Sequence, residues 1–300
     1  MASRRLILRW PRKTAKSAAF CLAGVAIGTG LYFGNLAYVA QSPAGGSTIS
    51  VGDRPYAVAV DPAAHTAYVA NNGGNSVSVI NTVTNRVTAT VRVGNGPYDV
   101  AVDPAAHTAY VVNYDGNSVS VINTATNTVT ATVRVGNEPR AVAVDPAAHT
   151  AYVVNSFDSS VSVINTVANR VTATVGVGNG PGAVAVDPAA HTAYVVNYDG
   201  NSVSVINTVT NRVTVVAVGV GGFPDAVAVD PAAHTAYVVN NADNSVSVIN
   251  TVTNTVTATV GVGNGPDAVA VDPAAHTVYV ANSADNSVSV IKGAYGSPRR

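Results

Sequence analysis

Residues 57–71 read Ala-Val-Ala-Val-Asp-Pro-Ala-Ala-His-Thr-Ala-Tyr-Val-Ala-Asn, and this stretch decides the fold. Its central Asp-Pro-Ala-Ala-His-Thr segment returns unchanged five more times along the chain. Successive Asp-Pro pairs are separated by 42, 42, 42, 43 and 42 residues, counted at Asp61, Asp103, Asp145, Asp187, Asp230 and Asp272. A fixed period of this length indicates a repeat architecture, in which each unit buries apolar surface against its neighbours.

Each repeat contains four short runs with strand character, separated by turn residues. In the first unit they are residues 57–60, 66–70, 76–80 and 87–93, which are rich in Val, Ala and Thr. Only 11% of all residues are charged, and no helical period is found in the repeats. Four antiparallel strands in each unit predict an all-β chain, a six-bladed β-propeller of four-stranded antiparallel blades.

The two ends of the repeat region complement each other. The sixth unit stops after its third run, at residues 287–291, while an extra run at residues 48–52 precedes the first unit. This extra run, Thr-Ile-Ser-Val-Gly, matches the fourth-run ending Thr-Val-Arg-Val-Gly at residues 90–94. We therefore expect an N-terminal strand to close the last blade and to remove its exposed edge.

Residues 1–46 form a basic leader ahead of the propeller at 47–293, and residues 294–300 form a C-terminal tail. The leader carries no acidic residue but six basic ones, which are Arg4, Arg5, Arg9, Arg12, Lys13 and Lys16. Residues 17–40 are uncharged and long enough for either a signal peptide or a transmembrane anchor. The basic flank predicts an extracytoplasmic propeller, either secreted or anchored, whose only membrane contact is this segment.

The part of the chain after residue 41 has ten basic and sixteen acidic side chains, a net charge of −6. This sign argues against a nucleic-acid partner. The single cysteine, Cys21, lies in the leader, so the propeller can contain neither a disulfide nor a cysteine metal site. We expect no cofactor and a monomeric propeller.

The second strand of each unit reads Tyr-Val-x-Asn, at residues 68–71, 110–113, 152–155, 194–197, 237–240 and 279–282. With the Ser-Val-Ser-Val-Ile runs that follow, residues 47–293 resemble the YVTN family of β-propeller repeats. Ala or Val replaces the Thr of the family name, and six units are fewer than the seven blades familiar in that family. The resemblance implies a prokaryotic surface-layer or other exported, cell-surface protein.

Comparison of the six units separates two faces of the expected propeller. The scaffold face carries the Asp-Pro-Ala-Ala-His-Thr turns and the Asn-Thr-x-x-Asn turns, which hardly change. The variable face carries the turns between second and third strands and the links between units. On it we place two bases, Arg54 and Arg140, and ten acids: Asp53, Asp99, Asp115, Glu138, Asp158, Asp199, Asp225, Asp243, Asp267 and Asp285. This negative surface would attract a polar or cationic ligand, or a basic protein.

The residue after the proline that begins each first strand should lie nearest the central channel. These residues are Tyr56, Tyr98, Arg140, Gly182, Asp225 and Asp267, an asymmetric ring suited to a polar ligand with an apolar face. The single 43-residue spacing falls at residues 213–223, where we expect a β-bulge that brings Phe223 to the variable face as an anchor. Tyr56, Tyr98, Arg140, Asp225, Asp267 and Phe223 are therefore the candidate binding residues.

Three function classes remain open on these observations, of which cofactor-dependent electron transfer has the least support because the propeller has no Cys or Met and no exceptional His. The first is a non-enzymatic binding, interaction or surface-structural module that uses the acidic variable face. The alternative is a propeller hydrolase or lyase of the lactonase kind, with a divalent metal held by Asp225 and Asp267 at the channel mouth. The six repeated histidines are expected to stabilise turns rather than to bind metal, because each lies in a different blade. No catalytic residue is assigned.

Overall fold

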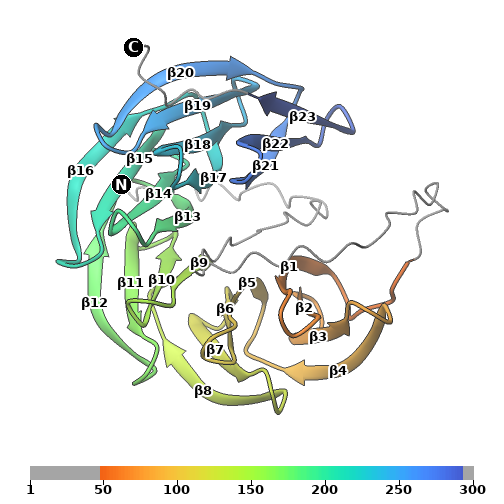
Figure 1. Cartoon of the computed structure of the whole chain (residues 1–300). Helices are drawn as coiled ribbons and strands as arrows, with labels where there is room; N and C mark the ends of the chain where they lie inside the picture. The colour runs from red at the N-terminus through yellow and green to blue at the C-terminus, as the bar shows by residue number, and fades with distance from the viewer. Residues whose placement is uncertain (1–47, 293–300) are drawn as a thin grey trace, which may run out of the picture.

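A computed structural model describes residues 48–292, apart from the side chain at position 216. Six antiparallel sheets follow one another around a ring, with their first strands toward the middle and their fourth strands on the outside (Figure 1). Five sheets have four strands and the last has three, each in simple sequence order. The predicted all-β, six-bladed propeller is confirmed.

Equivalent strands have the same length in all blades except for β16, and the sixth blade has three strands within residues 48–292. The first strands are β1 (Pro55–Asp61), β5 (Pro97–Asp103), β9 (Pro139–Asp145), β13 (Pro181–Asp187), β17 (Pro224–Asp230) and β21 (Pro266–Asp272). The second strands are β2 (Thr66–Asn71), β6 (Thr108–Asn113), β10 (Thr150–Asn155), β14 (Thr192–Asn197), β18 (Thr235–Asn240) and β22 (Thr277–Asn282). The third strands are β3 (Ser76–Asn81), β7 (Ser118–Asn123), β11 (Ser160–Asn165), β15 (Ser202–Asn207), β19 (Ser245–Asn250) and β23 (Ser287–Lys292). The fourth strands are β4 (Arg86–Arg92), β8 (Thr128–Arg134), β12 (Arg170–Gly176), β16 (Arg212–Gly219) and β20 (Thr255–Gly261).

The core lies between the blades rather than within any one of them. Tyr68 and Val77 of blade one (β1–β4) pack against Val111 and Ile122 of blade two (β5–β8). The same contact recurs at each of the next four junctions. Both faces of the second and third strands are therefore covered, which is why these strands are buried almost throughout instead of alternating between buried and exposed residues.

The invariant turns on the scaffold face are fixed locally. The Asp61 carboxylate accepts the backbone N–H of Ala64 at 3.0 Å, and the residue that ends the turn, His65, has a left-handed φ of 50°. All six histidines at this position have φ between 45° and 50°. The turn explains why Asp and His recur without any need for metal chemistry.

A buried asparagine at the end of each second strand ties two strands together. In blade four (β13–β16), Asn197 is fully buried, and its Nδ2 donates to Ser202 Oγ at 3.1 Å and to Ser204 Oγ at 3.0 Å. The same pair of bonds is present in every blade. The Asn of Tyr-Val-x-Asn and the serines of Ser-Val-Ser are thus one structural unit.

The extra residue of the fourth repeat lies in the outer strand of its blade. β16 has eight residues, whereas the other fourth strands have seven. The pairing of β15 with β16 is irregular at two places, compared with one in the blades on either side. The expected bulge is confirmed, and it leaves the inner strands of the ring undisturbed.

The ring has a seam between blade six (β21–β23) and blade one. Neighbouring first strands contact each other from β1 round to β21, but β21 makes no comparable contact with β1. In blade six, Tyr279, Val288 and Val290 are 43%, 60% and 50% exposed, whereas the equivalent Tyr68 of blade one is 1% exposed. The apolar face that every other blade turns toward its successor is therefore open here.

The closing strand expected from residues 48–52 is not shown. Ile49 and Val51 pack on Val69 and Ile80 of blade one, as the end of a preceding fourth strand would, but residues 48–51 form no strand. No strand within residues 48–292 pairs with the outer edge of β23. Closure by this segment stays a prediction.

The leader, Cys21 and the C-terminal tail lie outside the described residues. Within residues 48–292 no helix is long and apolar enough to cross a membrane.

Candidate functional site

Each link on the variable face is clamped between two blades. The residue before the proline of each first strand has a left-handed backbone in all six units. In four units its N–H donates to an asparagine of the preceding blade, as from Gly265 to Asn244 Oδ1 at 2.9 Å and from Phe223 to Asn201 Oδ1 at 2.9 Å. Its carbonyl accepts from the turn of its own blade, as in Ser283 N–H to Gly265 at 2.9 Å. The links are therefore held firmly enough to position side chains.

Three of these left-handed positions hold residues for which the conformation is unfavourable. Gly96, Gly180 and Gly265 adopt it without strain, but Arg54, Glu138 and Phe223 have φ of 51°, 51° and 48°. The cost is about 1–2 kcal/mol for a residue with a side chain. Glycine would avoid this strain, as it does at the other three positions. The retained strain therefore suggests that these three side chains have a function.

The ring positions of blades one to three come together in one aromatic cluster. The rings of Tyr56 and Tyr98 are 4.3 Å apart between centroids, and Tyr98 lies 5.5 Å from Tyr114. Arg140 places its guanidinium carbon 5.6 Å from the centroid of Tyr114, and the Tyr114 hydroxyl donates to Glu138 Oε2 at 2.7 Å. We call these five residues the channel-mouth cluster.

Charges around the cluster act on Tyr98 from two sides. Burial is the main reason that the pKa of the Tyr98 hydroxyl lies well above its usual range, and the Tyr56 hydroxyl raises it further. The positive charge of Arg140 opposes this rise in the pKa, while the negative charge of Asp225 adds to it. Asp225 therefore belongs to the same electrostatic environment as Tyr98. Asp267 occupies the equivalent position of β21, and both of its carboxylate oxygens are buried.

Phe223 lies in a second aromatic group, on blades four and five. Its ring stacks on Tyr198 with centroids 5.0 Å apart and an interplanar angle of 24°, and it is 47% exposed. Phe157, in the turn between β10 and β11, is 72% exposed. The expectation that Phe223 reaches the variable face is consistent with its backbone contact to Asn201 in the preceding turn.

Several acids of the variable face have structural roles. Asp158 Oδ2 accepts the backbone N–H of Asn137 at 2.7 Å, Asp243 Oδ2 that of Gly222 at 2.6 Å, and Asp285 Oδ2 that of Asn264 at 2.5 Å. The bonds from Asn264 lower the pKa of Asp285. The negative charge remains on this face, but these carboxylates already fasten the links between blades.

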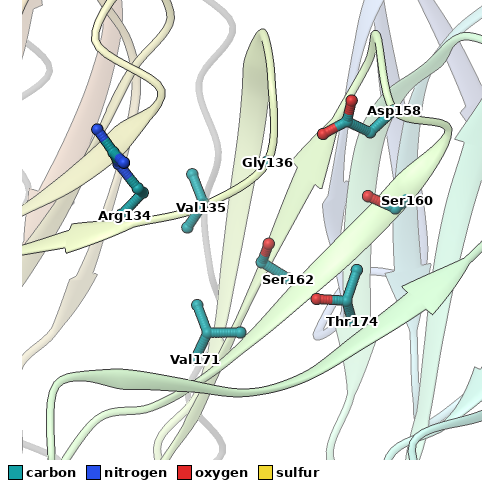
Figure 2. A pocket seen from close by; sticks show the side chains of 8 residues that line it. All are labelled: Arg134, Val135, Gly136, Asp158, Ser160, Ser162, Val171 and Thr174. Atoms are coloured by element: carbon teal, nitrogen blue, oxygen red, sulfur yellow. The ribbon is translucent and has the colours of Figure 1, made fainter.

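Two small depressions lie at blade junctions. One, of about 300 Å³, is lined by Arg134, Asp158, Ser160 and Ser162 among others, and Arg134 stands on the far side from Asp158 (Figure 2). Its two serines already accept hydrogen bonds from Asn155. The other, of about 370 Å³, is lined by Glu138, Arg140, Phe157, Asn179 and Asp199, with Ser156, Ser159 and Gly180. This second depression adjoins the channel-mouth cluster.

Asp99 follows Tyr98 in β5 and is a carboxylate that occurs at this position in one blade only. The equivalent position in the other five blades is alanine. Asp99 Oδ1 accepts the N–H of Val100 and Oδ2 that of Val142 in β9, both at 2.9 Å. Burial raises the pKa of Asp99 to about 6, although the two N–H groups lower it. The sequence placed Asp99 on the variable face, but in the structure its carboxylate bridges two inner strands.

The raised pKa of Asp99 predicts a specific pH dependence of stability. Between about pH 4 and pH 6 the folded protein binds more protons at Asp99 than the unfolded chain, so stability falls as pH rises through this window. We expect this contribution to be about 1–2 kcal/mol, because Asp99 is only half-buried. Unfolding midpoints measured from pH 4 to pH 7 should decline less steeply for Asp99→Asn than for the wild type. Parallel profiles for the two proteins would contradict the assignment.

The structure brings the predicted ring residues Tyr56, Tyr98 and Arg140 into one cluster. The sequence did not single out Tyr114, Tyr198 or Phe157. These three lie in the turns between second and third strands, where the first residue after the invariant asparagine is Tyr, Ser or Asn. Their variation between repeats was the available signal. How far the turns reach toward the links depends on the packing of neighbouring blades, which the sequence does not show.

Solved structures that resemble this chain include the following two. Hydrazine synthase of Kuenenia stuttgartiensis aligns with a TM-score of 0.56 at 20% identity, covering 85% of this chain and 100% of that one. A functionally unknown protein from Desulfotomaculum acetoxidans DSM 771 aligns with a TM-score of 0.70 at 18% identity, covering 81% of this chain and 84% of that one. The fold is that of a β-propeller. At these identities the likeness concerns the propeller fold alone. No family model and no curated protein matches the sequence.

The metal-dependent alternative finds no added support in the propeller. Within residues 48–292 no three His, Cys, Asp or Glu side chains are grouped so that they could hold a metal ion. Asp225 and Asp267 would need a third ligand, and the hydrolase or lyase reading stays a hypothesis from the sequence.

Proposed function

We propose that this chain is an exported, non-enzymatic binding module of the YVTN-repeat type that holds its partner at the variable face. The observation that carries the proposal is the channel-mouth cluster. Tyr56, Tyr98 and Tyr114 with Arg140 and Glu138 break the repeat symmetry together at one place, next to a depression of about 370 Å³. Concave surface with aromatic walls and a few polar groups is typical of ligand sites.

Export and surface location rest on the leader and on the resemblance of the repeats to surface-layer proteins. A cell-surface module would meet envelope polymers or surface proteins, and its negative charge would select against nucleic acids and other polyanions. Rigid links clamped between blades favour binding without a large rearrangement, since the side chains are already placed.

Replacing Arg140 by Gln and Tyr114 by Phe together is expected to weaken binding to insoluble prokaryotic cell envelopes about tenfold. The double change removes the guanidinium above the ring and the hydroxyl bond to Glu138, which orient the cluster. Co-sedimentation of the purified protein with envelopes measures the effect. Val167→Ser, at a 73% exposed position on the scaffold face, is the matched control and should bind like the wild type.

Equal sedimentation of the wild type, the double variant and the control would refute a role for this face. Unfolding midpoints of all three proteins should be compared first, so that a loss of fold is not mistaken for a loss of binding.

A further inference from the structure

The depression beside Arg140 combines an apolar wall with closely spaced hydrogen-bonding groups. Phe157 supplies the wall and is 72% exposed, while Glu138, Asp199, Asn179 and Arg140 supply two carboxylates, an amide and a guanidinium. A purely apolar ligand would remove water from these polar groups without replacing its hydrogen bonds, at a cost to binding. A ligand that has both an apolar face and a rim of hydroxyl groups would satisfy the wall and the polar groups at once.

The charges of the depression argue against anionic ligands. Two carboxylates face one guanidinium, and Arg140 already interacts with the ring of Tyr114 and with the charge of Glu138. A phosphate or a uronic acid would meet net repulsion. A lysine-rich peptide would gain from the carboxylates, but it would place its charges beside a guanidinium. An uncharged ligand avoids both penalties.

Aromatic side chains extend on both sides of the depression. Tyr56 and Tyr98 lie near the starts of β1 and β5, and Tyr114 lies in the turn between β6 and β7. Tyr198, which stacks on Phe223, directly precedes the lining residue Asp199. An aromatic ring presents a negative face, which attracts the polarised C–H bonds on the apolar side of a sugar ring. Aromatic residues spread over five blades suit a ligand longer than the depression itself.

Phe223 carries the strongest indication that these side chains are used. Its N–H bond to Asn201 at 2.9 Å is the same as that of Gly265 to Asn244, so the backbone contact needs no side chain. The left-handed φ of 48° disfavours a bulky residue. The aromatic ring is thus retained against backbone preference, stacked and 47% exposed.

We propose that the ligand of the variable face is an extended, uncharged polysaccharide chain, with one sugar in the depression against Phe157 and further sugars on the flanking aromatic residues. This inference rests on the proposed function, because it names the ligand class for the same face.

The test uses the purified protein and defined probes. Affinity electrophoresis compares hydroxyethyl cellulose, an uncharged polysaccharide, with polygalacturonate and with poly-lysine, and calorimetry compares glucose with a β-linked glucan hexasaccharide. We expect retardation by the uncharged polymer only, and at least tenfold tighter binding of the hexasaccharide than of glucose. Phe157→Ala should lower the hexasaccharide affinity about tenfold. Val167→Ala, which removes an equally exposed apolar side chain from the scaffold face, should leave it unchanged.

Phe223→Gly separates binding from stability. We expect it to lower the hexasaccharide affinity, because the stacking ring is lost. We expect it to raise the thermal unfolding midpoint, because glycine adopts the left-handed φ without strain. Retardation by polygalacturonate as strong as by hydroxyethyl cellulose, or an unchanged affinity of Phe157→Ala, would overturn the proposal. Retardation by poly-lysine alone would overturn the sugar ligand while leaving the binding face intact, whereas failure of the envelope experiment concerns the face itself.

Discussion

Gly178→Ala is expected to destabilise the propeller by about 3 kcal/mol, whereas Gly176→Ala, two residues earlier, should be nearly neutral. A Cβ at position 178 would lie 2.5 Å from Nδ2 of Asn197, but at position 176 it would meet nothing within 4 Å. Asn197 cannot move away without losing its bonds to Ser202 and Ser204 in a fully buried site. Denaturant unfolding midpoints of the two variants and the wild type measure the difference.

The same contrast can be repeated two junctions further along the ring. Gly261 has open space around its Cβ position, while a Cβ at Gly263 would lie 2.6 Å from Nδ2 of Asn282. If both members of each pair were equally stable, the asparagine would be adaptable and the close approach would not determine the link geometry. Because φ is not left-handed at Gly178 and Gly263, their backbone conformation does not require glycine. The substitutions therefore test whether glycine is needed there only because a Cβ would not fit.

A disulfide between positions 49 and 288 is expected to form on mild oxidation and to raise stability by about 4 kcal/mol, close to a 10 °C rise in the thermal midpoint. In blade one Val77 pairs with Val91, and Val288 and Ile49 are their counterparts at the seam. Closure would bury Tyr279, Val288 and Val290, which is worth about 5 kcal/mol. We propose that this burial draws the N-terminal run onto β23.

The protein for this experiment carries Ile49→Cys and Val288→Cys, with Cys21→Ser so that no other thiol is present. Ile49→Cys with Val290→Cys, shifted by two residues, is the register control and should crosslink more slowly. Faster crosslinking of the control would show a different register. Absence of both crosslinks would exclude this segment as the closing strand.

The scaffold was predictable because its causes are local and repeated. The Asp-Pro-Ala-Ala-His turn is fixed by a carboxylate and a backbone N–H three residues apart, as in Asp61 and Ala64. The predicted runs at 66–70 and 76–80 correspond to β2 (Thr66–Asn71) and β3 (Ser76–Asn81). Six copies of one pattern repeat the same turns and strands, so each unit supports the assignment made in the others.

The site was only partly predictable because its residues are distant in sequence. Equivalent positions in neighbouring blades were expected to meet near the channel, which was right for Tyr56 and Tyr98. The partnership of Tyr114 with Glu138 and Arg140 depends on how a turn of blade two reaches the first strand of blade three. Phe223 was expected on the variable face, but its stacking partner Tyr198, in the neighbouring turn, was not predicted.

The sequence by itself determined the repeat, its four strands and the two different faces, because period, turn chemistry and strand propensity act within one unit of about forty residues. Only the tertiary structure decided which variable side chains meet, that Asp99 bridges β5 and β9, and that Tyr279 stays exposed at the seam. Those features depend on the packing of one blade on the next, and no single repeat contains that information.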